Sequence, residues 1–193
     1  MKQTSDPFGI GHNNGPALDA GVSWRKHSWT KARADLLPKL PIEILRNRVK
    51  RARELGLPYK TYASVRASTG RDVIGFLFST NALRLIRQGD RLPTLHADKL
   101  AGLVDTDRVA LVQHPHSTKD VRTLANLDAA HSAPRAHAGW AQSRDMIVAA
   151  LRDRGAIGDA YLMIGDTHFE REWAVAGKMA GFFTSDRYFE LTK

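Results

Sequence analysis

Three short apolar runs, each followed by polar residues, are the most regular feature of the hydrophobic pattern. They cover residues 73–78, 108–113 and 160–164, and their length favours buried strands over helices. For the first run, a helix over residues 71–86 is an alternative, because periodicity does not distinguish the two in a continuous apolar stretch. Gly75 favours the strand.

Amphipathic segments before, between and after these runs predict helices. Their apolar residues recur at the spacing of one helical face, and glycine or proline marks many of the ends. The predicted helices cover residues 41–56, 58–70, 82–87, 94–103, 120–130, 140–154 and 169–181, a loop covers 131–139, and a short strand covers 188–191. The alternation predicts an α/β fold over residues 71–193, with a small, mostly parallel sheet flanked by helices.

The last strand–helix unit has the clearest local signals. Asp166 and Thr167 are good N-cap residues, and Thr167 with Glu170 three residues later forms the capping-box pattern. Gly181 is expected to end this helix. Because ligands usually bind where the strands of an α/β sheet end, Asp166 is a candidate for ligand contact as well as for capping.

Composition narrows the class of protein. The chain has 193 residues, a net charge of +9 and no cysteine. The charge favours an anionic partner, either nucleic acid or another anion. The lack of cysteine excludes disulfides and thiol catalysis. No apolar run approaches a membrane span and the first residues lack an apolar signal region, so we expect a cytoplasmic protein without a membrane partner.

The positive charge is prominent near the start of the chain. Residues 1–23 are rich in glycine and proline, which predicts a flexible tail, and residues 24–70 predict a basic helical segment. Cations interleaved with indole rings are what single-stranded nucleic acid contacts. The candidates for nucleic-acid binding are Trp24, Arg25, Lys26, Trp29, Arg46, Arg48, Lys50, Arg51 and Arg53. The alternative is that the tryptophans pack a short helix and the cations are solvated.

One peptide in the predicted tail resembles known sequences. Residues 8–16, Phe-Gly-Ile-Gly-His-Asn-Asn-Gly-Pro, are similar to the opening of many short proteins of α-proteobacteria and their phages. The resemblance implies a bacterial or phage neighbourhood and names no activity. The glycines do not predict a phosphate loop, because no strand precedes them and no helix start follows.

If the three apolar runs are parallel neighbours, the polar residues that follow them gather at one rim. That rim would hold His114, His116, Asp166, His168 and Glu170. Imidazole and carboxylate groups together can bind a divalent metal or transfer a proton near neutral pH. The catalytic candidates are Asp166, His168, His114 and His116, and the metal candidates are Asp166 and His114. The alternative is that polar residues are ordinary in such turns, since no spacing here matches a metal signature.

The turn after the third run also resembles a family motif. Residues 164–167, Ile-Gly-Asp-Thr, with Ala-Gly pairs at 176–177 and 180–181, resemble the last motif of haloacid-dehalogenase-like phosphatases. In that family this aspartate helps to hold magnesium, which implies the same role for Asp166. Residues 105–107, Asp-Thr-Asp, are similar to the nucleophile motif, but they precede a strand, whereas the family's motif ends a strand near the chain start. We attribute the resemblance to the shared chemistry of such turns and do not assign the family.

These observations support three hypotheses of different classes. The first is a nucleic-acid-associated accessory protein of phage or mobile-element origin, which contacts phosphates through the basic helix. The second is a metal-assisted phosphoester hydrolase with its site at the carboxyl ends of the strands. The third is a protein-interaction adaptor without chemistry.

Overall fold

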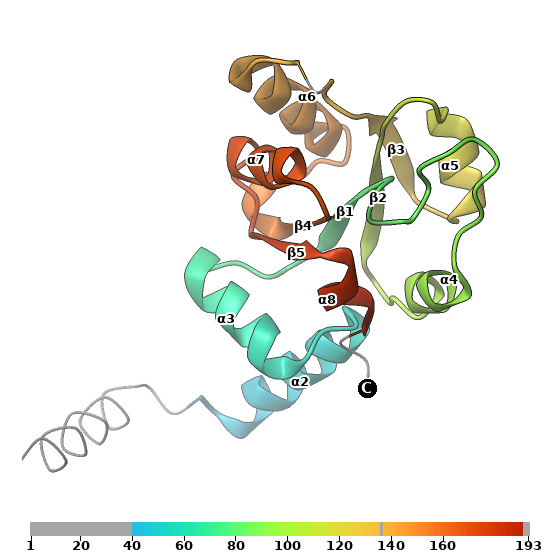
Figure 1. Cartoon of the computed structure of the whole chain (residues 1–193). Coiled ribbons are helices and arrows are strands. Elements are labelled where there is room, and N and C mark those ends of the chain that lie inside the picture. Colours follow the sequence, from blue (N-terminus) through green and yellow to red (C-terminus); the bar gives the residue numbers. More distant parts are fainter. Residues whose placement is uncertain (1–39, 136, 191–193) are drawn as a thin grey trace, which may run out of the picture. The chain divides into compact units, whose positions relative to one another are not determined.

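A five-stranded parallel sheet forms the centre of the fold. The computed structural model describes residues 40–135 and 137–190, so the predicted tail over residues 1–23 lies outside the described residues. The chain separates into two compact units, residues 1–42 and 43–193, and the sheet belongs to the second. The strands are β1 (Gly75–Ser79), β2 (Asp107–Val112), β3 (Ala129–Ser132), β4 (Tyr161–Gly165) and β5 (Gly181–Thr184), in the order β3-β2-β1-β4-β5 (Figure 1). The predicted α/β class is confirmed.

The three predicted strands are parallel neighbours. Phe78 of β1 lies opposite Ala110 of β2 on one side and Ile164 of β4 on the other. The chain leaves β1 towards β2 and β3, then returns to the other side of β1 for β4 and β5. In open parallel sheets, ligands bind in the crevice outside the carboxyl ends of the strands at such a reversal.

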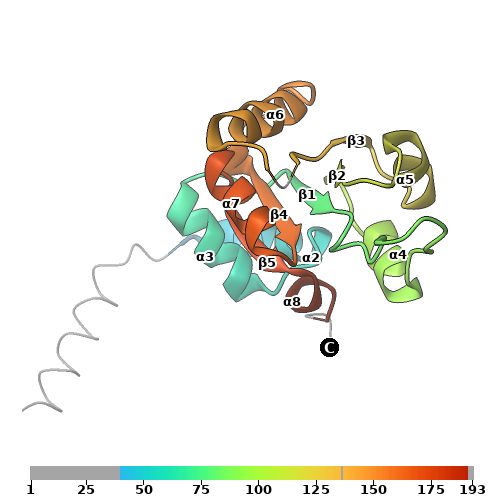
Figure 2. The same ribbon diagram turned by 45° about the horizontal axis from the view of Figure 1, so that its top comes forward.

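Helices cover both faces of the sheet, as Figures 1 and 2 show. The helices are α2 (Ile42–Glu54), α3 (Tyr59–Thr69), α4 (Thr94–Ala101), α5 (Thr118–Leu124), α6 (Trp140–Arg152), α7 (His168–Ala176) and α8 (Ser185–Glu190), with a 3-10 turn, η1, at Gly158–Ala160. Phe76 and Phe78 pack with residues of α2–α5 and α8, whereas Leu77 between them packs with α6 and α7. This alternation explains why β1 reads as a continuous apolar run, because both of its faces are buried. Within the described residues, we find no helix with the length and apolar character that a bilayer span requires.

Local signals fix the start of α7 as predicted. Thr167 is its N-cap, and the hydroxyl of Thr167 accepts a hydrogen bond from the backbone N–H of Glu170. The carboxylate of Glu170 accepts in turn from the backbone N–H of Thr167, which completes the capping box.

Several predicted elements differ in the structure because packing overrides local pattern. Residues 82–87 form a turn and not a helix, with the backbone of Arg84 in the left-handed region at φ 59°. The predicted helix over 120–130 ends at Leu124, and β3 occupies part of the predicted loop 131–139 by pairing with β2. Gly181 begins β5, and residues 185–190 form α8 where a strand over 188–191 was predicted.

Candidate functional site

The tips of β1, β2 and β4 are joined by one buried carboxylate. Asn81, which follows β1, donates from Nδ2 to Oε1 of Glu170 over 2.9 Å, and Gln113, which follows β2, donates from Nε2 to the same oxygen over 3.4 Å. Oε2 of Glu170 accepts from the backbone N–H groups of Asp166 (2.6 Å) and Thr167 (2.8 Å). The polar turns predicted to converge therefore do meet.

Glu170 is fully buried, with 0 % of its surface exposed. A buried carboxylate is costly unless its charge is compensated by hydrogen bonds, and here four donors converge on it. These contacts fix the side-chain amides of Asn81 and Gln113. Thr80 strengthens the arrangement by donating its hydroxyl to Oε1 of Gln113 over 2.9 Å. The sequence indicated Glu170 as a capping residue, but nothing in it indicated the contacts with Asn81 and Gln113.

Asp166 lies at this rim and is engaged by a cation of the chain itself. Its Oδ2 accepts from Nη1 of Arg84 over 2.7 Å, and its Oδ1 accepts from the backbone N–H of Ser185 over 2.9 Å. Arg84 also pairs with Asp186 at the start of α8. Asp166 therefore connects the turn after β1 to the start of α8. A metal ion at Asp166 would have to replace Arg84.

The predicted histidines do not gather around Asp166. His168 is 74 % exposed and pairs with Glu172 over 3.1 Å on the surface of α7. His114 lines a cavity, and His116 has a buried Nε2 without a hydrogen-bond partner in the described part of the chain. Among residues 40–135 and 137–190, no three His, Asp or Glu side chains are arranged to hold a metal ion. The structure therefore does not assemble the predicted metal set.

A cavity of about 690 Å³ lies at the carboxyl edge of the sheet, and we call it the carboxyl-edge cleft. Its walls come from the turns after β1, β2 and β3 and from the first turns of α7. It is lined by Asn81, Ile86, Gln113, His114, Ala133, Pro134, Arg135, His137, Phe169 and Trp173. The sequence placed His114 at this rim, but Arg135 and the two aromatic residues carried no signal that tied them to it.

Residues 105–107, which are similar to the nucleophile motif of the phosphatases, lie at the opposite, amino edge of the sheet. Asp107 begins β2 and lies opposite Gly75 at the start of β1. Its carboxylate accepts two hydrogen bonds from Arg154, of 2.6 and 2.9 Å, and one from the hydroxyl of Tyr161. Asp107 and Asp166 thus lie at opposite ends of the sheet and do not form one site.

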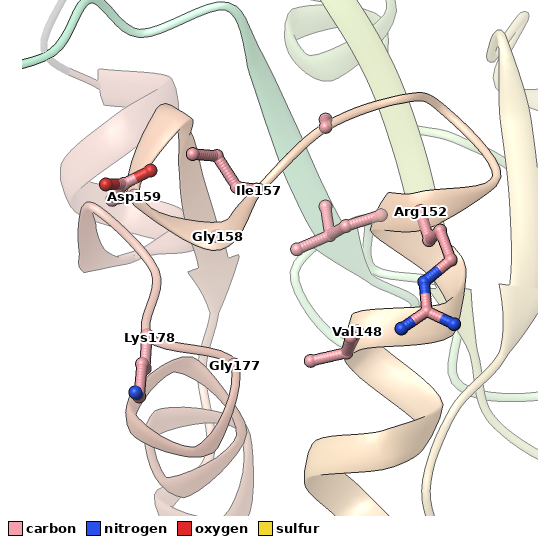
Figure 3. A pocket seen from close by; sticks show the side chains of 9 residues that line it. Val148, Arg152, Ile157, Gly158, Asp159, Gly177 and Lys178 are labelled. Carbon is pink, nitrogen blue, oxygen red and sulfur yellow. The ribbon is translucent and has the colours of Figure 1, made fainter.

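A second hollow, of about 450 Å³, lies between the C-terminal half of α6 and the turns that flank η1 and follow α7. Figure 3 shows Val148 and Arg152 of α6 on one side, with Ile157, Asp159 and Lys178 on the other. Asp159 is paired with Arg71 over 3.0 Å. The lining is mainly apolar, and it includes none of the residues predicted to be catalytic, metal-binding or nucleic-acid-binding.

The cations of α2, the helix predicted to contact phosphates, differ in their surroundings: one is packed against the domain and others are exposed to solvent. The side chain of Arg51 is only 16 % exposed, and it donates to the backbone carbonyls of Val73 and Asp105, each over 3.0 Å, and pairs with Glu54. Arg51 therefore holds α2 to the body of the domain. Arg46, Lys50 and Arg53 are exposed, and Arg48 is half-buried with no partner for its Nε among the described residues. Trp24, Arg25, Lys26 and Trp29 lie outside the described residues.

Comparison of the chain with protein-family models, with curated proteins and with solved structures finds no match.

Proposed function

We propose that this protein associates with nucleic acid through the exposed face of α2. The observation that supports the proposal is the distribution of charge along the chain. Residues 40–74 contain eight Lys and Arg against three Asp and Glu, whereas residues 75–193 contain fifteen against fourteen. Residues 1–39 contain six against three, so nearly all of the excess lies in the first 74 residues. An excess concentrated in one part of the chain favours contact with a polyanion over a general increase in solubility.

Helical geometry arranges three of these cations in one stripe. Arg46, Lys50 and Arg53 follow each other at spacings of four and three residues, so they share the exposed face of α2 over about 10 Å. Arg46 pairs with Glu43 and Lys50 with Glu54, at 2.7 and 3.7 Å. The side chains of Arg46 and Lys50 are themselves exposed, and ion pairs of such cations contribute only about 0–1 kcal/mol, so phosphate groups can replace them.

We also propose that the protein is cytoplasmic and comes from a bacterium or its phage. The resemblance of residues 8–16 supports the bacterial or phage origin, and the lack of cysteine is compatible with a reducing compartment. The metal-assisted hydrolase receives no comparable support, because Arg84 occupies the carboxylate of Asp166.

A titration with matched charge variants tests the proposal. Fluorescence anisotropy with labelled single-stranded and duplex oligonucleotides is measured at about 50 mM and about 200 mM salt for the full chain, because phosphate contacts make affinity fall with salt. The triple variant Arg46→Ala, Lys50→Ala, Arg53→Ala is compared with Arg91→Ala, Lys119→Ala, Arg144→Ala, which removes the same charge from exposed positions elsewhere.

The α2 triple variant should bind at least about tenfold more weakly than the control triple and show a shallower salt dependence, since up to three phosphate contacts are lost. Equal affinities for the two triple variants would reject α2 as the contact surface. Absence of binding by the unaltered chain at low salt would reject the proposed function.

A further inference from the structure

We propose that the carboxyl-edge cleft binds a nucleoside monophosphate, that is, a small ligand with a planar ring and one phosphate group. The proposal is independent of the nucleic-acid contact at α2, because the two surfaces share no residue. It rests on the position of the cleft, on the unpaired arginine that lines it, on its exposed ring and on its fixed amide groups.

The position is where an open parallel sheet is expected to bind a ligand. β1 lies between β2 and β4, and the chain order reverses at this point. Asn81 follows β1, Gln113 follows β2 and Arg135 follows β3, so residues after three neighbouring strands face one cavity. Its volume, about 690 Å³, lies within the range of small-molecule sites, roughly 300–1,000 Å³.

Every titratable side chain that lines the cleft is basic. These are His114, Arg135 and His137, and none of the three has an ion pair or side-chain hydrogen bond within the described residues. Glu170 lies beneath Asn81 and Gln113 and is fully buried. Glu172 lines a small adjoining hollow that shares Arg135, and it pairs with His168. An arginine without a carboxylate partner favours an anionic ligand, and arginine suits phosphate because of its planar set of donors, while the two imidazoles add further hydrogen-bonding groups.

The second wall of the cleft is aromatic. Phe169 lies in the first turn of α7 and is 46 % exposed, and Trp173 follows one turn later on the same face. Trp173 is buried in the core beneath, so it fixes the floor, whereas Phe169 presents a ring to solvent. An exposed ring beside an unpaired arginine is the combination that binds a base and a phosphate together.

The amide groups of the cleft are fixed before any ligand arrives. Asn81 and Gln113 direct their side-chain N–H donors to the buried Glu170. The Oε1 of Gln113 accepts from Thr80, whereas the Oδ1 of Asn81 has no hydrogen-bond partner among the residues that the structure describes. Asn81 lines the cleft, and in the proposed complex this oxygen accepts from an amino or hydroxyl group of the ligand.

Isothermal titration calorimetry with AMP, GMP, CMP and UMP, and with two partial ligands, tests the proposal. Adenosine lacks the phosphate, and inorganic phosphate lacks the ring. At least one nucleotide should bind, and adenosine and inorganic phosphate should each bind at least about tenfold more weakly, because each keeps only one set of contacts. Failure of all four nucleotides, or equal binding of inorganic phosphate alone, would overturn the proposal.

Three variants locate the site. Arg135→Ala should weaken nucleotide binding about tenfold, which is the effect of removing one charged hydrogen-bonding group, and Phe169→Ala should weaken it several-fold. Arg144→Ala is the matched control, since Arg144 is exposed on α6, pairs with Asp145 and does not line the cleft. Circular dichroism verifies the fold of each variant. Equal affinities of Arg135→Ala and Arg144→Ala would contradict the proposed site, and unchanged nucleotide binding by the α2 triple variant is expected.

Discussion

The two edges of one parallel sheet use charge in opposite ways. At the amino edge, Asp107 is held by Arg154, and Asp128 is held by Arg108 through hydrogen bonds of 3.0 and 3.1 Å. Burial alone would raise the pKa of Asp128, but the hydrogen bonds from Arg108 outweigh it and the pKa is lowered. At the carboxyl edge, the acid Glu170 is enclosed and Arg84 is paired with Asp166 and Asp186, but Arg135 in the cleft has no side-chain partner in the described part of the chain.

The difference between the edges indicates that charges at the amino edge stabilise the fold, whereas the unpaired charge at the carboxyl edge is available to bind a ligand. Ion pairs that are complete within the chain, as at the amino edge, leave no charge to attract a ligand and contribute to the folded state. Cations without a partner contribute little to folding, and they remain available to an anion. The buried Glu170 is what allows this arrangement, because it fixes the turns of the carboxyl edge without placing a negative charge in the cleft.

The largest effect is expected from Glu170→Ala. Four donors lose their acceptor and the capping box is removed, so the free energy of unfolding should fall by about 3–4 kcal/mol. Urea denaturation provides the measurement. Glu172→Ala, two residues later on the exposed surface of α7, is the matched control and should stay within about 0.5 kcal/mol of the unaltered protein. Similar losses for both variants would mean that Glu170 does not organise this edge.

Arg154→Met should affect the stability that depends on the amino edge and leave ligand binding at the carboxyl edge unchanged. It leaves the carboxylate of Asp107 with only the hydroxyl of Tyr161, and it should lower the free energy of unfolding by about 1–2 kcal/mol. Nucleotide affinity should not change. Arg152→Met, which alters an exposed cation on α6, should change neither quantity. If Arg154→Met stays folded but loses nucleotide binding, the ligand binds at the amino edge, which would contradict the proposed site at the carboxyl edge.

A smaller effect is expected from a cation that belongs to neither edge. Lys99 of α4 contacts the ring and the backbone carbonyl of Tyr188, and burial lowers its pKa to about 8. Between that value and the ordinary 10.5, the unfolded chain holds the proton and the folded chain does not, so stability should rise as the pH increases above about 8. Solvent screening limits the gain to about 1 kcal/mol or less.

Urea denaturation from about pH 7 to about pH 9 measures this gain. Lys99→Met should lose the rise with pH, whereas Lys60→Met, an exposed lysine on α3, should keep it. Stability that falls over this interval would contradict the proposed effect of burying Lys99.

The elements that could be predicted from the sequence are those with local signals or with continuous apolar runs. The capping box of Thr167 and Glu170 and the adjacent position of three strands are examples. The strand β3 could not be predicted, because its Ala-Ala-His-Ser sequence forms a strand only by pairing with the edge of β2. The turn at Arg84 was also missed, because the pairing of Arg84 with Asp166 joins residues 82 positions apart.

The candidate site was predictable to the same extent. The convergence of polar turns follows from parallel neighbouring strands, and it was expected. The internal role of Arg51 was not, because its partners Val73 and Asp105 are backbone carbonyls that no pattern of side chains marks. Arg135 and Phe169 come together only through the packing of α6 and α7 on the same face of the sheet.

The most direct test of the contrast between the edges is a ¹⁵N–¹H chemical-shift map of the full chain during a titration with the tightest-binding nucleotide. Our account predicts shifts concentrated at Asn81, Gln113 and Phe169, with the amides of Asp107 and Tyr161 unchanged. Shifts concentrated at the amino edge, or along α2 alone, would contradict it.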